Sequence, residues 1–289
     1  MQYVGNVIRP PSEADSIILQ VTVGCSYNKC TFCGAYKDVR FALKDEEAIR
    51  QDLLFARRYC RNANRLFLAD GDVLILSQKR LIRLFLLIRE HLPRINRISL
   101  YGNARAIRGK SAAQLSELKS LGLSRVYMGL ESGCDLVLGS IDKGETAKSQ
   151  CAAAASIRQA GIFLSITALL GLGGVSLSER HAVETGKVLA AMAPHQIAVL
   201  TLIPLENTQL GRDVLSGKFV LPGPDLILQE LYLLLYQLTG IRCQFHANHA
   251  STYLPLAGRL PKDRDELLKR IQQAMNGAVA LVPEQRRAL

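Results

Sequence analysis

The sequence predicts an α/β protein in which six short strands alternate with helices. Two observations lead to this fold class. Short apolar runs of β-forming residues alternate with longer runs of helical spacing, and Gly or Pro often separates them. The 289 residues are 48% hydrophobic and 21% charged, which is ordinary for a packed globular chain with one large domain. Strands that alternate with helices in this way indicate a parallel sheet flanked by helices.

Each element follows from its local pattern. The predicted strands are Ser16–Val23, Arg65–Asp70, Arg97–Tyr101, Arg125–Leu130, Ile162–Leu170 and Ile197–Ile203. The predicted helices are 44–60, 78–91, 111–122, 146–160 and 178–192. Asp45 is the predicted N-cap of the first helix, and Gly122 and Gly161 are predicted to end two others. Periodicity does not separate a doubly wound sheet from a full or partial barrel, but in both folds ligands gather at the carboxyl ends of the strands.

The pattern changes after Pro204. A Gly- and Pro-rich loop at 211–224 leads into an apolar helix at 226–238, a polar segment and a charged helix at 262–275. We therefore expect three parts: a lead-in at 1–15, the main domain at 16–205, and a C-terminal helical extension at 206–289 that covers the mouth of the main domain.

Composition also indicates the cellular compartment of the protein. Seven cysteines, an odd number, make a disulfide scaffold a poor interpretation and favour reduced thiols. The sequence has neither an apolar run long enough to span a membrane nor an N-terminal export signal. A cytoplasmic location without membrane contact is the expectation.

The net charge of +11 raises the question of a nucleic-acid partner. The basic residues are scattered along the chain, Trp is absent and aromatic residues make up only 6%. Since a clustered basic face and stacking aromatics are the usual signs of nucleic-acid binding, such a partner is not favoured.

Three cysteines carry the strongest chemical signal. Cys25, Cys30 and Cys33 lie within nine residues, directly after the first strand. Thiolates at this spacing favour an iron–sulfur cluster or zinc, but structural zinc usually takes four protein ligands, and the other cysteines are isolated. A [4Fe–4S] cluster on three thiolates leaves one iron open for a ligand. Zinc with a distant fourth ligand, and thiols with no metal at all, are the alternatives.

This triplet resembles the cluster motif of the radical S-adenosylmethionine (SAM) superfamily, with the aromatic Phe32 before the last cysteine. The usual spacing in that family is three residues and then two, whereas this sequence has four and then two, a variant within the superfamily. The resemblance implies a partial parallel (β/α)6 barrel of radical SAM type, with a [4Fe–4S] cluster on Cys25, Cys30 and Cys33 and SAM on its open iron.

Two further strand ends are similar to family motifs. Asp70-Gly71-Asp72 resembles the Gly-Gly-Glu-type loop that holds the amino group of SAM, with one glycine replaced and a shorter acid. The segment 129–133 resembles the Gly-hydrophobic-Glu-Ser motif of the branch with Elongator-like, methylthiotransferase and coproporphyrinogen-dehydrogenase-like proteins. That likeness implies that Glu131 and Ser132 lie near the ribose and amino-acid portion of SAM.

The fifth strand corresponds to the place where the family packs apolar residues and backbone amides on adenine, which implies a cofactor contact for Leu170. Thr167 shares a face with Ser165 and points toward the cavity in our interpretation. Asn103 and Arg105 follow the third strand. They are candidates for contact with SAM and with an anionic substrate group, the alternative being a loop hydrogen bond and a solvated charge.

Polar residues in the tail form a second group of candidates. Asn248, His249 and Tyr253 are predicted to line the substrate site, and a metal site with Cys-x2-His-x2-His spacing from Cys243 or plain structural hydrogen bonding are the alternatives. Three other histidines are predicted to be surface residues (His91, His181 and His195). Cys134 is predicted to be a small buried filler.

Taken together, the resemblance implies an enzyme that reductively cleaves SAM to give a 5′-deoxyadenosyl radical, which abstracts hydrogen from an unidentified substrate. A small-molecule substrate and a flavodoxin- or ferredoxin-type electron donor are the expected partners. A tRNA-modifying radical SAM enzyme and a non-catalytic iron–sulfur or zinc scaffold are the alternatives.

Overall fold

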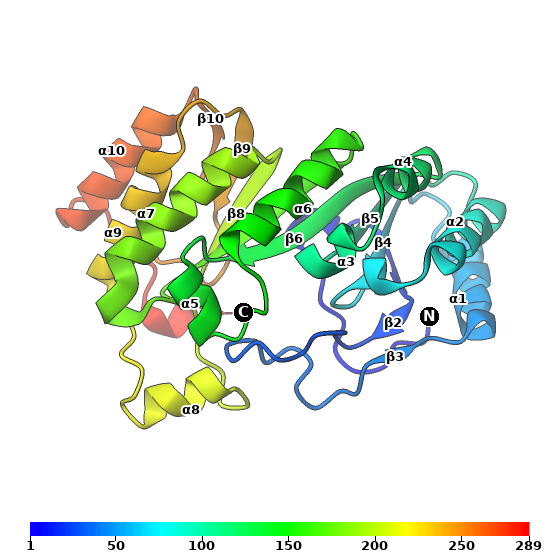
Figure 1. The fold of residues 1–289 in the computed structure, drawn as a ribbon, viewed down its shortest axis with the longest axis horizontal. Helices are drawn as coiled ribbons and strands as arrows, with labels where there is room; N and C mark the ends of the chain where they lie inside the picture. Colours follow the sequence, from blue (N-terminus) through cyan, green and yellow to red (C-terminus); the bar gives the residue numbers. More distant parts are fainter. Residues whose placement is uncertain (289) are drawn as a thin grey trace. The chain divides into compact units, whose positions relative to one another are not determined.

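The computed structural model describes residues 1–288, which form two compact units. Unit 1 comprises Met1–Asn28, Ala35–Met128 and Ala155–Leu164, and unit 2 comprises Lys29–Gly34, Gly129–Ala154 and the chain from Ser165 onward. The boundary between them falls inside the cysteine loop, so Cys25 belongs to unit 1, whereas Cys30 and Cys33 belong to unit 2. Figure 1 follows the chain through its helices and strands.

Unit 1 is built on parallel strands in the order β1-β4-β5-β6. Their bounds are β1 Ile17–Gln20, β4 Arg65–Ala69, β5 Arg97–Tyr101 and β6 Leu123–Glu131, of which the last three residues belong to unit 2. The first predicted strand is interrupted at Val21. Its last residues form β2 (Thr22–Val23), which pairs antiparallel with β3 (Ala42–Leu43) just before the cysteine loop.

The helices of unit 1 are α1 Glu46–Tyr59, α2 Gln78–His91, α3 Ala104–Arg108 and α4 Ala112–Ser120, with short 3-10 turns at Pro11–Glu13 and Val73–Ile75. Three of the four helices lie where the sequence predicts, and the short α3 was not predicted. The Asp45 carboxylate accepts a hydrogen bond from Glu47 N, which confirms the predicted N-cap of α1. Ser111 and Gln114 form a reciprocal capping box at the start of α4.

Unit 2 contains β7 Phe163–Leu170, whose first two residues belong to unit 1, followed by β8 Gln196–Thr201, β9 Cys243–Ala247 and β10 Leu256–Leu260. The strands β7, β8 and β9 are parallel, and β10 is antiparallel to β9. The C-terminal extension therefore holds two strands that the prediction of a helical extension omitted. Their local signal is weak: in β9, Cys243, Phe245 and Ala247 alternate with the polar Gln244 and His246.

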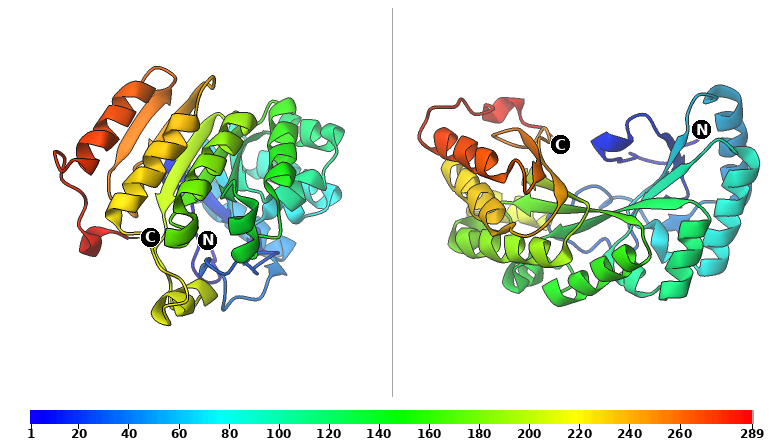
Figure 2. Two further views of the ribbon diagram at one scale, coloured as in Figure 1. Left: turned by 60° about the vertical axis from the view of Figure 1, so that its left-hand side comes forward. Right: turned by 90° about the horizontal axis from the view of Figure 1, so that it is seen from above.

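The helices of unit 2 are α5 Asp135–Ser140, α6 Ala147–Gln159, α7 Gly174–Met192, α8 Gln209–Leu215, α9 Pro224–Gln237 and α10 Arg264–Met275, with a 3-10 turn at Glu284–Arg286; the end of α6 belongs to unit 1. In both views of Figure 2, α9 lies between α7 and α10. The prediction of a continuous loop at 211–224 is wrong, because α8 occupies its start. Thr208 caps this helix by accepting a hydrogen bond from Gly211 N.

The strands bury one apolar face. In unit 1 this face includes Leu66, Leu68, Ile98, Leu100 and Val126, all at most 2% exposed. The opposite face carries Phe67, Ser99, Tyr101, Arg125 and Tyr127, since successive side chains alternate. The second face is polar and aromatic and is also buried in part, since Phe67 and Ser99 are 0% and Tyr127 is 5% exposed.

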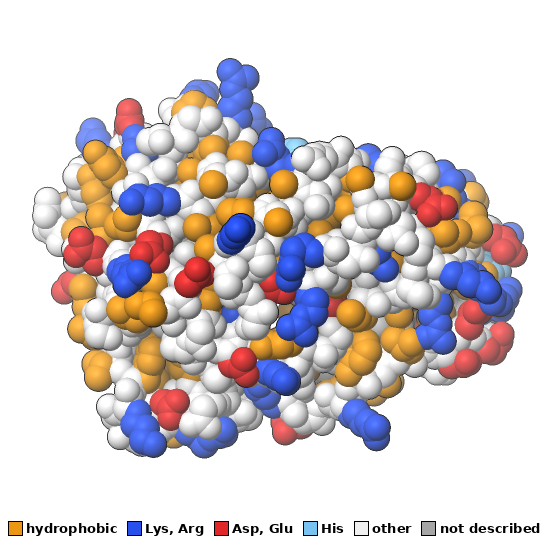
Figure 3. All heavy atoms as spheres, viewed as in Figure 1, with side chains coloured by type: hydrophobic (Ala, Val, Ile, Leu, Met, Phe, Trp, Pro, Cys, Tyr) orange, Lys and Arg blue, Asp and Glu red, His pale blue; other side chains and the backbone are white. Residues whose placement is uncertain are grey.

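The predicted α/β class, with mostly parallel strands and accompanying helices, is confirmed. Within residues 1–288, no helix has the length and apolarity that crossing a lipid bilayer requires. Figure 3 shows that, on the face in view, Lys and Arg side chains are dispersed among acidic, polar and apolar ones.

Candidate functional site

Asp70 connects the end of β4 to the start of the cysteine loop. Its carboxylate accepts hydrogen bonds from Gln20 Nε2 at 2.8 Å, Gly24 N at 3.1 Å and the Tyr36 hydroxyl at 3.4 Å. The side chain is 1% exposed, and burial raises its pKa although these hydrogen bonds act against the rise. Asp70 also has a φ of 80°, an unusual conformation for a residue with a side chain. The structure thus uses this carboxylate to hold the residue before Cys25.

Gly71 lets the turn after β4 lie directly against Cys25. Its N–H donates to Gly24 O at 3.2 Å. A Cβ added at Gly71 would come within 2.8 Å of Cys25 Cβ and 3.2 Å of its Sγ. Only a glycine fits this contact without displacing the cysteine. The close approach explains the small residue in this position of the Asp70-Gly71-Asp72 segment.

We expect Gly71→Ala to lower both stability and iron binding. The added methyl overlaps Cys25, and overpacking of this kind costs about 1–3 kcal/mol. The measurements are the thermal midpoint and the iron content after anaerobic reconstitution. Gly139→Ala is the matched control, because a Cβ there meets no atom within 4 Å. Equal iron content and equal midpoints in the two variants would contradict the prediction.

Asp72 is held by the loops that follow β2 and β5. Its Oδ2 accepts from Ser26 Oγ at 2.8 Å and from Asn103 Nδ2 at 2.6 Å, and its Oδ1 accepts from Asn103 N at 3.4 Å. Burial raises the pKa of Asp72 to about 6, and the bonds from Ser26 and Asn103 oppose that rise. Asn103 also caps α3 through Ala106 N. The structure thus brings together two predicted residues, Asp72 and Asn103. They follow β4 and β5, which are neighbouring parallel strands, so their side chains are expected at the same edge of the sheet.

Arg105 lies next to the first half of the cysteine loop. Its guanidinium is 5.1 Å from the ring centroid of Tyr27, which is a cation–π distance. Arg105 is exposed and is two residues beyond Asn103.

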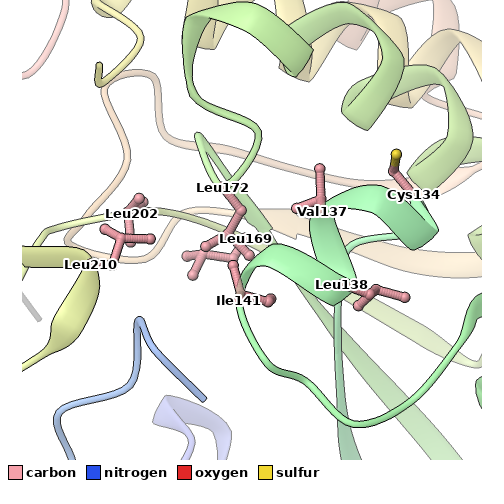
Figure 4. Close-up of a cluster of buried hydrophobic side chains, with 8 residues drawn as sticks. All are labelled: Cys134, Val137, Leu138, Ile141, Leu169, Leu172, Leu202 and Leu210. Atoms are coloured by element: carbon pink, nitrogen blue, oxygen red, sulfur yellow. The ribbon is translucent and has the colours of Figure 1, made fainter. Parts of the chain in front are cut away.

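The second half of the cysteine loop is anchored in unit 2. Thr31 N donates to Ile141 O at 2.9 Å, and Thr31 O accepts from Leu210 N at 2.9 Å. Asn207 Nδ2 donates to Gly34 O at 3.1 Å. Phe32 packs on a buried apolar cluster, shown in Figure 4: Cys134, Val137, Leu138, Ile141, Leu169, Leu172, Leu202 and Leu210. Phe32 therefore fixes the loop by packing.

Glu131 ends β6 beside a partly buried lysine. It has a φ of 64°, and its carboxylate folds back over Gly129 to meet Lys143 Nζ at 3.0 Å. A Cβ at Gly129 would overlap Glu131 Oε1, which explains the glycine. Burial lowers the pKa of Lys143, but the negative charges of Glu131, Cys30 and Cys33 raise it by more, so the pKa lies above its ordinary value.

Ser132 belongs to a buried hydrogen-bond network behind this strand end. Its Oγ contacts His181 Nδ1 at 2.8 Å and accepts from Cys134 N at 3.0 Å. His181 Nε2 contacts Leu169 O at 3.1 Å, which requires a proton on Nε2 because a carbonyl only accepts. The prediction that His91 and His181 are surface residues is wrong, since both are buried; the prediction of Cys134 as a buried filler is confirmed.

Glu230 of α9 completes the network from the C-terminal extension. It is 0% exposed and accepts hydrogen bonds from Gly171 N and Ser178 Oγ, both at 2.7 Å. Burial raises its pKa to about 7, and burial lowers the pKa of the neighbouring His181 to about 4. Because Gly171 directly follows β7, Glu230 fixes the strand end next to Leu170.

Thr167 and Ser165 share one face of β7, as predicted from the alternation of side chains. Ser165 Oγ donates to Gln196 Oε1 at 2.9 Å. Thr167 lies opposite Ala198, which in turn lies opposite His246 of β9. Leu170 is 2% exposed.

The tail candidates have mostly internal partners. His249 Nδ1 contacts Ser251 Oγ at 2.9 Å, and that oxygen accepts from Thr201 N at the end of β8. The Tyr253 hydroxyl donates to Glu284, and Arg287 stacks on its ring at 4.0 Å. Asn248 is exposed.

The alternative metal site in the tail is not formed. Cys243 and His246 are three residues apart on β9 and therefore point to opposite faces. Among residues 1–288, no three His, Cys, Asp or Glu side chains are gathered closely enough to hold a metal ion, and this finding covers the tail segment and the cysteine triplet alike.

Sequence reasoning missed four residues that shape these strand ends: Ser26, Tyr36, Lys143 and Glu230. The last of them had a visible signal, because it is the one charge in the otherwise apolar stretch 226–238. Such a lone acid requires partners when it is buried. The partners of the other three come from distant segments, and no local pattern indicates them.

The donor set and its surroundings fit an iron–sulfur cluster. None of the seven cysteines forms a disulfide bond. Gly71 lets the backbone after β4 lie against Cys25 without displacing it, and Lys143 supplies positive charge toward Cys30 and Cys33. Thiolates need such charge compensation in a partly buried site.

Solved structures share this fold at low sequence identity. The radical S-adenosylmethionine methyltransferase TsrM from Kitasatospora setae aligns with a TM-score of 0.57 and 16% identity, over 70% of this chain and 39% of its own length. Coproporphyrinogen III oxidase (HemN) from Escherichia coli aligns with a TM-score of 0.57 and 17% identity, over 92% and 70%. Methylornithine synthase (PylB) aligns with a TM-score of 0.52 and 15% identity, over 90% and 81%. This chain thus spans less than half the length of TsrM.

Sequence comparison gives the family. A comparison with curated proteins finds no match. A family model described as the Radical SAM superfamily matches residues 19–185, more than half of the chain, and includes all three cysteines of the triplet. The family expected from the cysteine motif is therefore confirmed: this chain belongs to the radical SAM superfamily.

Proposed function

We propose that this protein is an enzyme that cleaves SAM reductively at a [4Fe–4S] cluster held by Cys25, Cys30 and Cys33. The observation that carries the proposal is the family match over residues 19–185, which contains the triplet and the strand ends around it. Family membership supports the expected cofactor pair of cluster and SAM. When bound, this pair supplies a 5′-deoxyadenosyl radical that takes a hydrogen atom from the substrate.

The residues of this chain have distinct tasks in the proposal. Asp70 holds the loop before Cys25, and Asp72 with Asn103 orders the adjoining strand ends. Glu131 is the carboxylate placed to bind a polar portion of SAM. Leu170 and the backbone beyond it, fixed by Glu230, support the adenine. The surrounding apolar packing keeps water away from the reacting atoms.

The substrate class and partners extend the proposal. A small-molecule substrate is favoured, and Arg105, Asn248, His249 and Tyr253 are the residues proposed to face it, whereas Thr167 is proposed to face the cofactor. The electron comes from a flavodoxin- or ferredoxin-type donor in the cytoplasm. Nucleic acid is not favoured, since basic side chains on the face shown in Figure 3 are interspersed with acidic and apolar ones.

The decisive experiment is anaerobic reconstitution with iron and sulfide, followed by dithionite and SAM. We expect about four irons and four sulfides per chain, as a single [4Fe–4S] cluster requires, and formation of 5′-deoxyadenosine. Bound zinc without acid-labile sulfide would overturn the proposal in favour of a scaffold. Incubation with separate fractions of a deuterated cell extract would then show which fraction contains the substrate, by transfer of deuterium into 5′-deoxyadenosine.

A further inference from the structure

Lys143 holds a positive charge in a largely buried position. It lies in the turn between α5 and α6, and its side chain is 14% exposed. The turn is fixed by hydrogen bonds from Lys143 N to Leu138 O and from Asp142 N to Gly139 O. Its ammonium forms an ion pair with Glu131 at 3.0 Å. The charge is therefore held in place by both backbone and side chain.

The cysteine loop is bonded to the same turn. Thr31, which follows Cys30 and precedes Cys33 by two residues, donates its N–H to Ile141 O at 2.9 Å. Ile141 is two residues before Lys143. Burial lowers the pKa of Lys143, but the charges of Glu131, Cys30 and Cys33 raise it by more, in agreement with this connection. Lys143 thus lies close enough to influence charge on two of the three proposed ligands.

We propose that Lys143 is a positioning residue, acting through the thiolates of Cys30 and Cys33, whose fixed charge makes the cluster easier to reduce. This inference rests on the proposed function. Reduction adds one electron, supplied by dithionite or the donor protein, and so adds one unit of negative charge to the cluster. A cation in a poorly solvated site stabilises that added charge, because screening by water and salt is weak there. Charge near a cluster is one of the features that set its reduction potential.

Glu131 provides a second test of the inference, because its charge is opposite to that of Lys143. Its carboxylate partly neutralises the charge of Lys143. Removal of the Lys143 charge should therefore lower the reduction potential of the cluster, and removal of the Glu131 charge should raise it. A role limited to packing predicts no such reversal. A SAM group that contacts Glu131 would alter the same balance, which couples ligand binding to reduction.

The test is a redox titration of reconstituted protein without SAM, followed by electron paramagnetic resonance of the reduced cluster. At the wild-type midpoint, we expect Lys143→Met to lower the ratio of reduced to oxidised cluster about tenfold. Lys143→Arg should remain close to wild type. Lys148→Met is the matched control: it removes the same charge from an exposed site on α6, and its ratio should not change.

Glu131→Gln should raise the same ratio. The inference is overturned if Lys143→Met behaves like Lys148→Met, or if Glu131→Gln lowers the ratio. Should Lys143→Met fail to assemble a cluster, Glu131→Gln and Lys143→Arg decide the question by the same readout. A wild-type protein without a cluster would instead remove the proposed function, so the two failures are distinguishable.

Discussion

Replacing Cys25, Cys30 or Cys33 by alanine is expected to abolish cluster binding and SAM cleavage. Each substitution removes one of only three proposed protein ligands. Loss of a residue that merely supports a metal ligand costs about 10–100-fold, so loss of a ligand should lower 5′-deoxyadenosine formation by more than about 100-fold. Iron, acid-labile sulfide and 5′-deoxyadenosine are the quantities to measure after anaerobic reconstitution.

Cys60→Ala provides the control for these variants. Cys60 ends α1 outside the triplet and is only partly buried, so its loss should leave iron content and product formation near wild-type values. Full iron and sulfide retained in all three single variants, or in the triple variant, would show that the cluster assignment is wrong. Loss of iron in Cys60→Ala to the same degree would point to a general loss of folding.

Replacing Glu230 by glutamine is expected to make the stability of the protein depend on pH in the acid range. Two shifts of opposite kind meet at this buried site. The pKa of Glu230 rises from 4.5 to about 7, and the pKa of His181 falls from 6.5 to about 4, in both cases because of burial. Between about pH 4.5 and 6.5, the folded pair carries one proton on Glu230, whereas the unfolded pair carries one on His181. Since both states bind the same number of protons, the pair contributes almost no pH dependence.

Glu230→Gln removes the group whose pKa is raised and leaves His181, whose pKa is lowered. His181 alone then contributes stability that is present above pH 6.5 and is lost as the pH falls toward 4. Relative to wild type, the free energy of unfolding should be about 2 kcal/mol lower at pH 5 than at pH 8. Urea unfolding of both proteins at the two pH values measures this difference.

The mirror variant serves as the control. His181→Gln leaves Glu230, whose stabilising contribution is present below pH 4.5 and is lost as the pH rises through about 7. Its stability relative to wild type should therefore fall from pH 5 to pH 8, opposite to Glu230→Gln. Parallel pH profiles for the two variants and wild type would contradict the proposed sharing of one proton.

Local patterns predicted most elements of the fold. Asp45 and Ser111 cap helices where the sequence places them, because capping depends on a few adjacent residues. The strands β3, β9 and β10 and the helices α3 and α8 were missed. A five-residue strand with His and Gln between its buried residues has little local signal, and its pairing with β8 decides its conformation.

The candidate site was predictable only in part. Asp72 and Asn103 follow neighbouring parallel strands, so their contact follows from topology. The roles of Ser132 and Glu230 depended on distant segments. Ser132 is directed to His181 and Glu230 to Gly171, and neither partner is near in sequence.

The sequence alone determined the superfamily, the three proposed cluster ligands and the alternation of strands and helices, because all of these depend on residues close together along the chain. The tertiary structure decided how charges are paired around the ligands: Lys143 with Glu131, and Glu230 with the backbone of Gly171. A buried charge is stable only beside a partner, and which partner it meets depends on the packing of distant elements.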